Sequence, residues 1–179
     1  LQGLISFDPD RAQLLLDQLI QYLRATLSSS RAGSTTLEQE FSLMQAYLGL
    51  MSTRMGARLR FTLDLPEALR DIKVPPMLLQ PLVENAIQHG LEPKIEGGHI
   101  HVQASMDGGV LILTVADDGL GLDHPGQTKG THLGVANIRE RLRGMHGDAA
   151  SLSLAANHPA GVVARLTLPL PPTITSPLA

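Results

Sequence analysis

Two residues with ligand chemistry, Asn85 and His89, stand four positions apart in the segment 83–90, which belongs to an otherwise apolar predicted helix. At helical spacing they share one face, with Glu84 and Gln88 in the adjacent row. An Asn carbonyl oxygen is a suitable ligand for Mg²⁺ when phosphate oxygens and waters complete the octahedron. The alternative is an ordinary amphipathic helix whose polar stripe faces solvent. Taken alone, the segment favours that alternative and leaves a metal–phosphate site open.

Asp117 follows a strongly apolar segment and begins the run 117–122, which is rich in Asp and Gly. A carboxylate at a strand end can accept a hydrogen bond from an exocyclic amine such as that of adenine. Gly119 and Gly121 would let the backbone approach a flat ligand closely. The alternative is a tight turn of common composition. A dinucleotide fingerprint is excluded because His124 occupies the position of its third glycine.

Small residues fill positions 130–134, and the pattern predicts a loop that runs straight into a helix over about 135–145. Backbone N–H groups at a helix start, aided by the helix dipole, can bind an anion. The alternative is a flexible loop followed by an ordinary cap. No Walker A sequence is present, so a P-loop nucleotide site is excluded.

Composition narrows the class of protein further. The chain has 179 residues, a net charge of −3 and 43% hydrophobic residues, which indicates one folded core. The acidic balance and the 3% content of aromatic residues argue against nucleic-acid binding. No cysteine is present, which excludes disulfides and thiolate metal sites. No apolar run is long enough to span a membrane.

The hydrophobic pattern predicts the helices and strands that position these segments. Helical spacing predicts two helices, over about 8–27 and 36–57, joined by a polar loop, and Thr36 with Gln39 indicates a partial capping box at the second. Strict alternation predicts a strand at 59–65. Strand-like segments on either side of turns predict two hairpins, one over 99–115 and one over 151–168. A helix is expected to open at Pro75 and to stop near Gly90.

The order of elements predicts an α+β fold. We expect a two-layer α/β sandwich with a mixed, mostly antiparallel sheet covered by helices and preceded by a two-helix hairpin. The expected units are a helical hairpin over 1–58, a second domain over 59–170 and a loose tail over 171–179.

The three chemical segments together resemble the LytS-type sensor histidine kinases of bacteria. More broadly, the chain is similar to the ATP-binding fold shared by gyrase, the Hsp90 chaperones, histidine kinases and MutL. Residues 75–91 resemble the N box of that subfamily, 117–121 its G1 box and 130–142 its G2 box. The resemblance covers about residues 1–170, with the motifs in the expected order. One departure is His132, where the G2 box often carries a glycine.

The resemblance implies a role for each matching residue. Asn85 would coordinate Mg²⁺ that bridges the phosphates of ATP, Glu84 would orient a water or the phosphoacceptor, and His89 would line the phosphate end. Asp117 would hydrogen-bond the adenine amino group. Glu84, Asn85 and His89 would thus form the catalytic set. The implied ATP-binding set is Asn85, His89, Asp117, Gly119, Gly121, Gly130, Thr131, Leu133, Gly134 and Asn137.

The resemblance also implies an activity and partners. The reaction would be transfer of the γ-phosphoryl group of Mg-ATP to a His, and then to an Asp of a response regulator. The family implies that this regulator is of LytTR type. The first 60 residues contain no His. We therefore expect the acceptor upstream of Leu1, and a fragment that binds ATP without autophosphorylating. The N-terminal helices would form a homodimer, and the chain would be the cytoplasmic region of a bacterial inner-membrane protein anchored through upstream segments.

Two alternatives stay open at this point. One is a non-kinase ATPase, or a Ser kinase, on the same fold. The other is a degenerate interaction module that no longer uses ATP and controls its partner by contact, an alternative that His132 favours.

Overall fold

A computed structural model describes residues 9–31, 33–122 and 130–170 of the chain. A five-stranded sheet with the order β2-β4-β5-β7-β6 forms one layer. The pairing of β2 with β4 is parallel and the other three pairings are antiparallel. The strands are β2 (Leu59–Asp64), β4 (Gly98–Asp107), β5 (Val110–Asp117), β6 (Ser151–Ala156) and β7 (Val162–Pro169). The expected mixed, mostly antiparallel sheet is thus confirmed.

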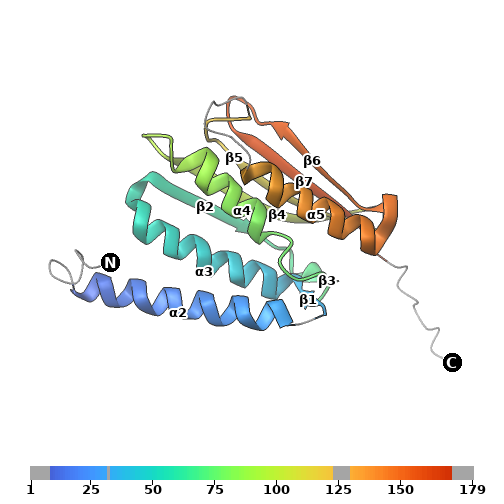
Figure 1. Ribbon diagram of the computed structural model, residues 1–179, viewed down its shortest axis with the longest axis horizontal. Coiled ribbons are helices and arrows are strands. Elements are labelled where there is room, and N and C mark those ends of the chain that lie inside the picture. The colour runs from blue at the N-terminus through green and yellow to red at the C-terminus, as the bar shows by residue number, and fades with distance from the viewer. Residues whose placement is uncertain (1–8, 32, 123–129, 171–179) are drawn as a thin grey trace.

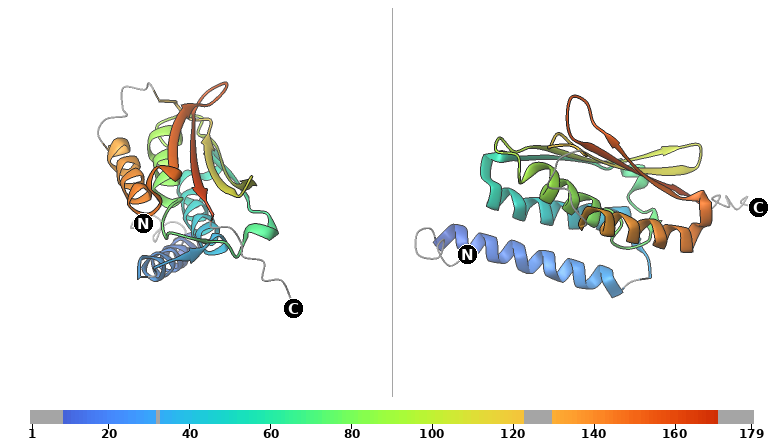
Figure 2. Two further views of the ribbon diagram at one scale, coloured as in Figure 1. Left: turned by 90° about the vertical axis from the view of Figure 1, so that its right-hand side faces the viewer. Right: turned by 45° about the horizontal axis from the view of Figure 1, so that its top comes forward.

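Helices cover one face of this sheet (Figures 1 and 2). The layer next to the sheet holds α3 (Leu37–Met55), α4 (Gln80–Asn85) and α5 (Gly130–His146). Outside it, α2 (Pro9–Arg31) lies along α3 as the outermost helix (Figure 2). A two-stranded ribbon, β1 (Thr35–Thr36) with β3 (Lys73–Val74), joins the start of α3 to the segment before α4. Short 3₁₀ turns complete the elements: η1 (Gly56–Arg58), η2 (Glu67–Leu69) and η4 (Gly147–Ala149).

The core lies between the sheet and α3, α4 and α5. Alternate residues of β4 and β5, among them Ile100, Val102 and Leu113, are fully buried because their side chains point to the helical face. From α3, Met44 and Leu48 belong to the same hydrophobic cluster. The core therefore extends across residue 58, and the division into two units there stays a prediction.

Local sequence signals fix several boundaries as expected. Thr36 caps α3 with a complete capping box: its hydroxyl accepts from the Gln39 N–H at 3.2 Å, and the Gln39 side chain accepts from the Thr36 N–H at 3.0 Å. Both predicted hairpins are present. The first helix is longer than predicted, since it reaches Arg31.

Two predicted helix starts were wrong, and both concern the motif segments. The helix expected from Pro75 begins only at Gln80, with Pro81 in its first turn where the missing N–H costs nothing. Its expected end near Gly90 is confirmed, since the π-helical turn η3 (Ala86–Leu91) that follows α4 directly ends at Leu91. At the other motif, α5 begins at Gly130, so residues 130–134 belong to a helix and form no loop.

Within the described residues, no helix is both long enough and apolar enough to cross a membrane.

Candidate functional site

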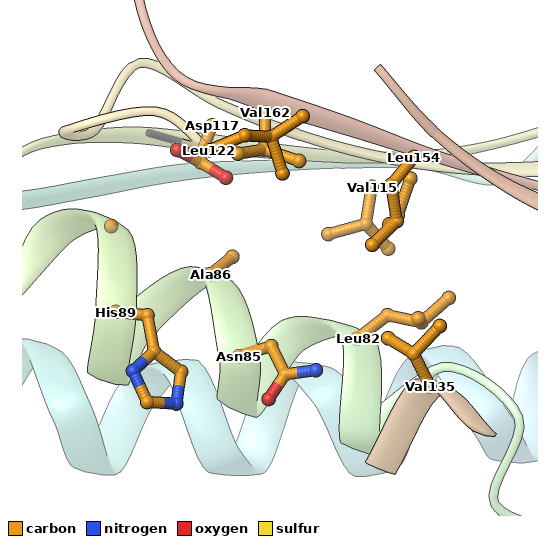
Figure 3. A pocket seen from close by; sticks show the side chains of 12 residues that line it. Leu82, Asn85, Ala86, His89, Val115, Asp117, Leu122, Val135, Leu154 and Val162 are labelled. Carbon is orange, nitrogen blue, oxygen red and sulfur yellow. The ribbon is translucent and has the colours of Figure 1, made fainter. Parts of the chain in front are cut away.

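A cavity lies between the sheet and the helices that carry the first motif (Figure 3). It holds about 430 Å³ of atom-free space, part of it open to solvent. The polar lining comes from Asn85, His89 and Asp117. Two motifs far apart in the sequence thus meet in one place. The apolar walls, which the sequence analysis did not single out, are Leu82, Ala86, Val115, Leu122, Val135, Leu154, Val162 and Ala164.

Asp117 is the buried acid of this cavity. It ends β5 on the helical side, and its side chain is directed across the gap toward the helix (Figure 3). The residue is only 3% exposed. Burial raises the pKa of the carboxyl to about 6, although the backbone N–H groups of Gly119 and Val162 donate to it and act in the opposite direction. A carboxylate that is buried and has acceptor capacity left can take a hydrogen bond from an amine of a flat ligand.

Glycines let the Asp117 loop lie against the helix. A Cβ atom on Gly90 would lie 2.8 Å from Oδ1 of Asp117, and one on Gly119 would lie 2.4 Å from the carbonyl carbon of Gly90. The N–H of Leu120 also donates to the carbonyl oxygen of Gly90 at 3.1 Å. A glycine is therefore needed at position 90 for the close approach of the Asp117 loop to the helix. Gly121 has a φ of +85°, which favours glycine.

Asn85 and His89 lie side by side on one face of the helix and line the cavity (Figure 3). The expected shared face is confirmed, and it includes the junction between α4 and η3. Among the described residues, the buried Nδ2 atom of Asn85 has no hydrogen-bond partner. A buried amide without a partner is costly, so this atom is suited to a ligand or a water.

The cavity fits Mg²⁺ only as an ion shared with a ligand. In the part of the chain that the structure describes, no three His, Asp or Glu side chains form a group that could hold a metal. Mg²⁺ commonly binds through one or two protein ligands, with waters and substrate phosphates as the others. The Asn85 side chain offers one such ligand, so the donor set is compatible with a magnesium–phosphate pair.

Glu84 has a different environment from its neighbour Asn85. Its Oε1 atom accepts from Nε2 of Gln80 at 2.8 Å and from the hydroxyl of Tyr22 at 3.3 Å. Tyr22 belongs to α2, so this carboxylate faces the helical hairpin and is not among the residues of the cavity wall. The sequence analysis placed Glu84 with the catalytic set and did not identify Tyr22.

A second buried acid, Glu40, holds the turn before α4. Only 1% exposed, it accepts the backbone N–H groups of Met77, Leu78 and Leu79 at 2.7, 3.0 and 3.3 Å. These bonds fix Met77 at a φ of +58°, and Nη2 of Arg141 in α5 donates to the Met77 carbonyl oxygen at 3.3 Å. Burial raises the pKa of Glu40, whereas the three N–H groups lower it.

Glu40 was not predicted from the sequence as a site residue, although its position carries a signal. Its position, three residues after Leu37 and four before Met44, places an acid on the apolar face of α3. Because α3, α4 and α5 all contact this turn, Glu40 helps to fix the helix that carries Asn85.

The remaining predicted site residues lie in α5 or beyond the described set. Asn137 is exposed on α5, and Val135 from the same helix lines the cavity. Gly130, Thr131, Leu133 and Gly134 lie in the first turns of α5, and their side chains are outside the described set, as is that of His132. Residues 123–129 and the tail 171–179 also lie outside the described residues.

Comparison with known proteins defines the class. The family described as histidine kinase-, DNA gyrase B- and HSP90-like ATPase matches residues 73–172, and the histidine kinase family matches residues 1–59. The chain therefore belongs to the histidine kinase-, DNA gyrase B- and HSP90-like ATPase family. This fold and family are those of the ATP-binding catalytic region of two-component sensor kinases.

Individual relatives agree with this class. The chain is 31% identical to sensor protein LytS of Staphylococcus epidermidis over 167 residues, which are 88% of this chain and 28% of that protein. It spans, in other words, less than a third of the length of that relative. The histidine kinase domain of the blue-light activated histidine kinase EL346 of Erythrobacter litoralis has a TM-score of 0.58 at 17% identity, covering 87% of this chain and 75% of that domain.

A third structure includes a partner protein. Histidine kinase ThkA, solved in complex with the response regulator protein TrrA, has a TM-score of 0.52 at 18% identity over 86% of this chain and 48% of that one. At such identities the two solved structures show a shared fold.

Proposed function

We propose that this chain binds Mg-ATP in the cavity and is the catalytic region of a bacterial sensor histidine kinase. The observation that carries the proposal is the meeting of Asp117 with Asn85 and His89 in one cavity. One end offers a buried carboxylate for the adenine amino group. The other offers an amide ligand and an imidazole for the phosphate end. Apolar walls between them suit a flat base.

The proposed reaction moves the γ-phosphoryl group of ATP to the imidazole of a His. A ring nitrogen of that His forms the bond to phosphorus as the bond to the β,γ-bridging oxygen breaks, and ADP leaves. Mg²⁺, when bound, neutralises charge on the phosphates during transfer. Asn85 holds the ion, His89 lines the phosphate end and Glu84 orients the acceptor.

The start of α5 completes the proposed ATP site. Backbone N–H groups at a helix start bind phosphate oxygens, and the dipole adds to the attraction. In this proposal Gly130, Thr131, Leu133 and Gly134 close over the triphosphate, Asn137 reaches it, and Gly119 and Gly121 shape the adenine end.

Partners and location follow from the same proposal. The acceptor His lies upstream of Leu1, and the helices over 1–58 form a homodimer. Exposed apolar side chains along α2, such as Leu16, Leu23 and Leu27, support a helix partner there. The phosphoryl group passes to an Asp of a response regulator of LytTR type. The chain is then the cytoplasmic region of a protein anchored in the inner membrane.

The test uses the longer protein that includes the segment before Leu1, incubated with γ-labelled ATP. The expected product is a protein-bound phosphate that is lost in acid and survives alkali, as phosphohistidine does. Asn85→Ala should remove it, whereas Gln88→Ala, an exposed change on the same helix, should keep it. An acid-stable label, or ATP hydrolysis without labelled protein, would favour the other uses of the fold.

A further inference from the structure

We propose that Tyr22 of α2 is a positioning residue that holds Glu84 against the helical hairpin and away from the phosphoryl-transfer site. This inference rests on the proposed role of Glu84 in orienting the acceptor. It assigns a function to a contact between two segments that are 62 residues apart in the chain.

The contact is a closed network of three side chains. The Tyr22 hydroxyl donates to Oε1 of Glu84 at 3.3 Å, and Nε2 of Gln80 donates both to Oε1 of Glu84, at 2.8 Å, and to the Tyr22 oxygen. The ring of Tyr47 from α3 lies beside that of Tyr22, with 5.5 Å between the centroids. The ring contact thus joins α2 to α3 beside the network.

The direction in which the Glu84 side chain points determines whether the contact with Tyr22 slows or speeds phosphoryl transfer. Successive residues of a helix point about 100° apart, so Asn85 can line the cavity while Glu84 faces α2. A carboxylate that orients an acceptor imidazole must lie within hydrogen-bond reach of it. Tyr22 and Gln80, which both donate to Oε1 of Glu84, lie where α2 contacts α4, so the bond from Tyr22 competes with that task.

The network is also suited to opening. Within the described residues the buried Oε1 atom of Gln80 has no hydrogen-bond partner, so the closed arrangement leaves one polar group unsatisfied. Burial and the nearby Glu84 raise the pKa of the Tyr22 hydroxyl, which therefore stays protonated and keeps donating near neutral pH. Movement of α2, rather than a change of pH, is what releases Glu84.

The element that bears Tyr22 is the outermost helix of the fold. Helix α2 is outermost and packs mainly on α3 (Figure 2). Its next residue, Leu23, is 49% exposed on the surface that we propose for the dimer partner. A shift of α2 within a dimer would thus reach Glu84 through a single hydroxyl group.

The experiment measures autophosphorylation rates in the longer protein that carries the acceptor segment, with kcat and the KM for ATP determined separately. Tyr22→Phe removes the hydroxyl and keeps the ring. Loss of one such hydrogen bond should raise kcat about fivefold. The KM for ATP should stay unchanged, because neither Tyr22 nor Glu84 lines the cavity.

Two further variants separate positioning from packing. Tyr47→Phe removes the hydroxyl of the adjacent ring and should leave kcat at the level of the wild type. In the double variant of Tyr22→Phe with Glu84→Gln, the rate should equal that of Glu84→Gln alone, because the hydroxyl acts only through the carboxylate. Thermal unfolding of each variant checks that the fold is retained.

The outcomes distinguish the two proposals. If Glu84→Gln is slow and Tyr22→Phe matches or falls below the wild type, Tyr22 does not withhold Glu84 and this inference is overturned alone. If Glu84→Gln has the rate of the wild type, the proposed catalytic role of Glu84 is wrong and the inference falls with it. A wild-type protein that forms no phosphohistidine overturns the proposed function itself.

Discussion

Replacing Asp117 by asparagine should make the ligand-free protein more stable at pH 7, even though the residue is central to the proposed site. The pKa of Asp117 rises from its ordinary value of 3.8 to about 6, chiefly because the carboxyl is buried. A difference of one unit between the folded and unfolded pKa corresponds to about 1.4 kcal/mol, so the ionised Asp117 side chain destabilises the fold by about 3 kcal/mol at neutral pH. Asparagine has almost the same shape and carries no charge.

The net gain should be smaller than that figure. The carboxylate accepts from two backbone N–H groups, those of Gly119 and Val162, and an asparagine can accept only with its single oxygen. A lost buried hydrogen bond costs about 1–2 kcal/mol, which leaves a gain of about 1–2 kcal/mol. Binding sites commonly hold groups that are unfavourable in the free protein.

The dependence on pH gives the sharper test. Between pH 3.8 and about 6 the folded protein binds more protons at Asp117 than the unfolded chain does. Stability of the wild type therefore falls as the pH rises through this window and levels off above it, whereas the variant lacks this contribution. The advantage of Asp117→Asn should be largest at pH 7, should vanish near about pH 5 and should be reversed at about pH 4, where the protonated carboxyl no longer destabilises the fold.

Urea denaturation of both proteins at several pH values measures this difference. Asp107→Asn removes the same charge from an exposed position at the end of β4 and should change the free energy of unfolding by less than about 0.5 kcal/mol. An Asp117→Asn protein that is less stable than the wild type at pH 7, or whose advantage is the same at pH 4, would refute the reasoning.

Three other changes test the site and its scaffold. Adenosine, which has no phosphate to titrate, should bind more weakly as the pH falls below 6 and Asp117 gains a proton. Binding titrations with adenosine from pH 7.5 to 5 would measure the change in affinity. An adenosine affinity that does not depend on pH would contradict the prediction. Asn85→Ala should remove the gain in affinity that Mg²⁺ gives a non-hydrolysable ATP analogue while adenosine affinity is retained, and calorimetry with and without Mg²⁺ checks both. Gly119→Ala should destabilise the fold by about 1–3 kcal/mol in urea denaturation, because its Cβ would overlap the backbone of Gly90. The control Gly144→Ala, in open space on α5, should stabilise the fold by up to about 1 kcal/mol. Equal effects of the two substitutions on stability would show that the structure relieves the overlap at Gly119.

Much of the fold could be predicted because its signals are local. Most of β4 alternates between buried and partly buried residues, and Thr36 and Gln39 lie three positions apart at a helix start. The shared face of Asn85 and His89 follows in the same way from helical spacing.

Features that depend on distant contacts could not be predicted. The turn before α4 is held by Glu40, which lies 37 residues before Met77 in the chain. The local sequence pattern carries no sign of this contact and therefore predicts a helix that begins at Pro75. The hydrogen bond of Glu84 to Tyr22 joins residues 62 positions apart, and the close approach of the Asp117 loop to Gly90 likewise joins two distant segments. In each case tertiary contacts overrode the local preference.

The central claim is that Asp117 recognises the base of a bound nucleotide, and calorimetric titration with a non-hydrolysable ATP analogue tests it most directly. The wild-type chain should bind the analogue in the presence of Mg²⁺, and Asp107→Asn should bind it equally well. Because a hydrogen bond to a charged group contributes about 1.5–3 kcal/mol, Asp117→Asn should weaken binding by about 10- to 100-fold. Equal affinity of the Asp117→Asn protein and the wild type, or no binding by a folded wild-type chain at millimolar nucleotide, would contradict the account.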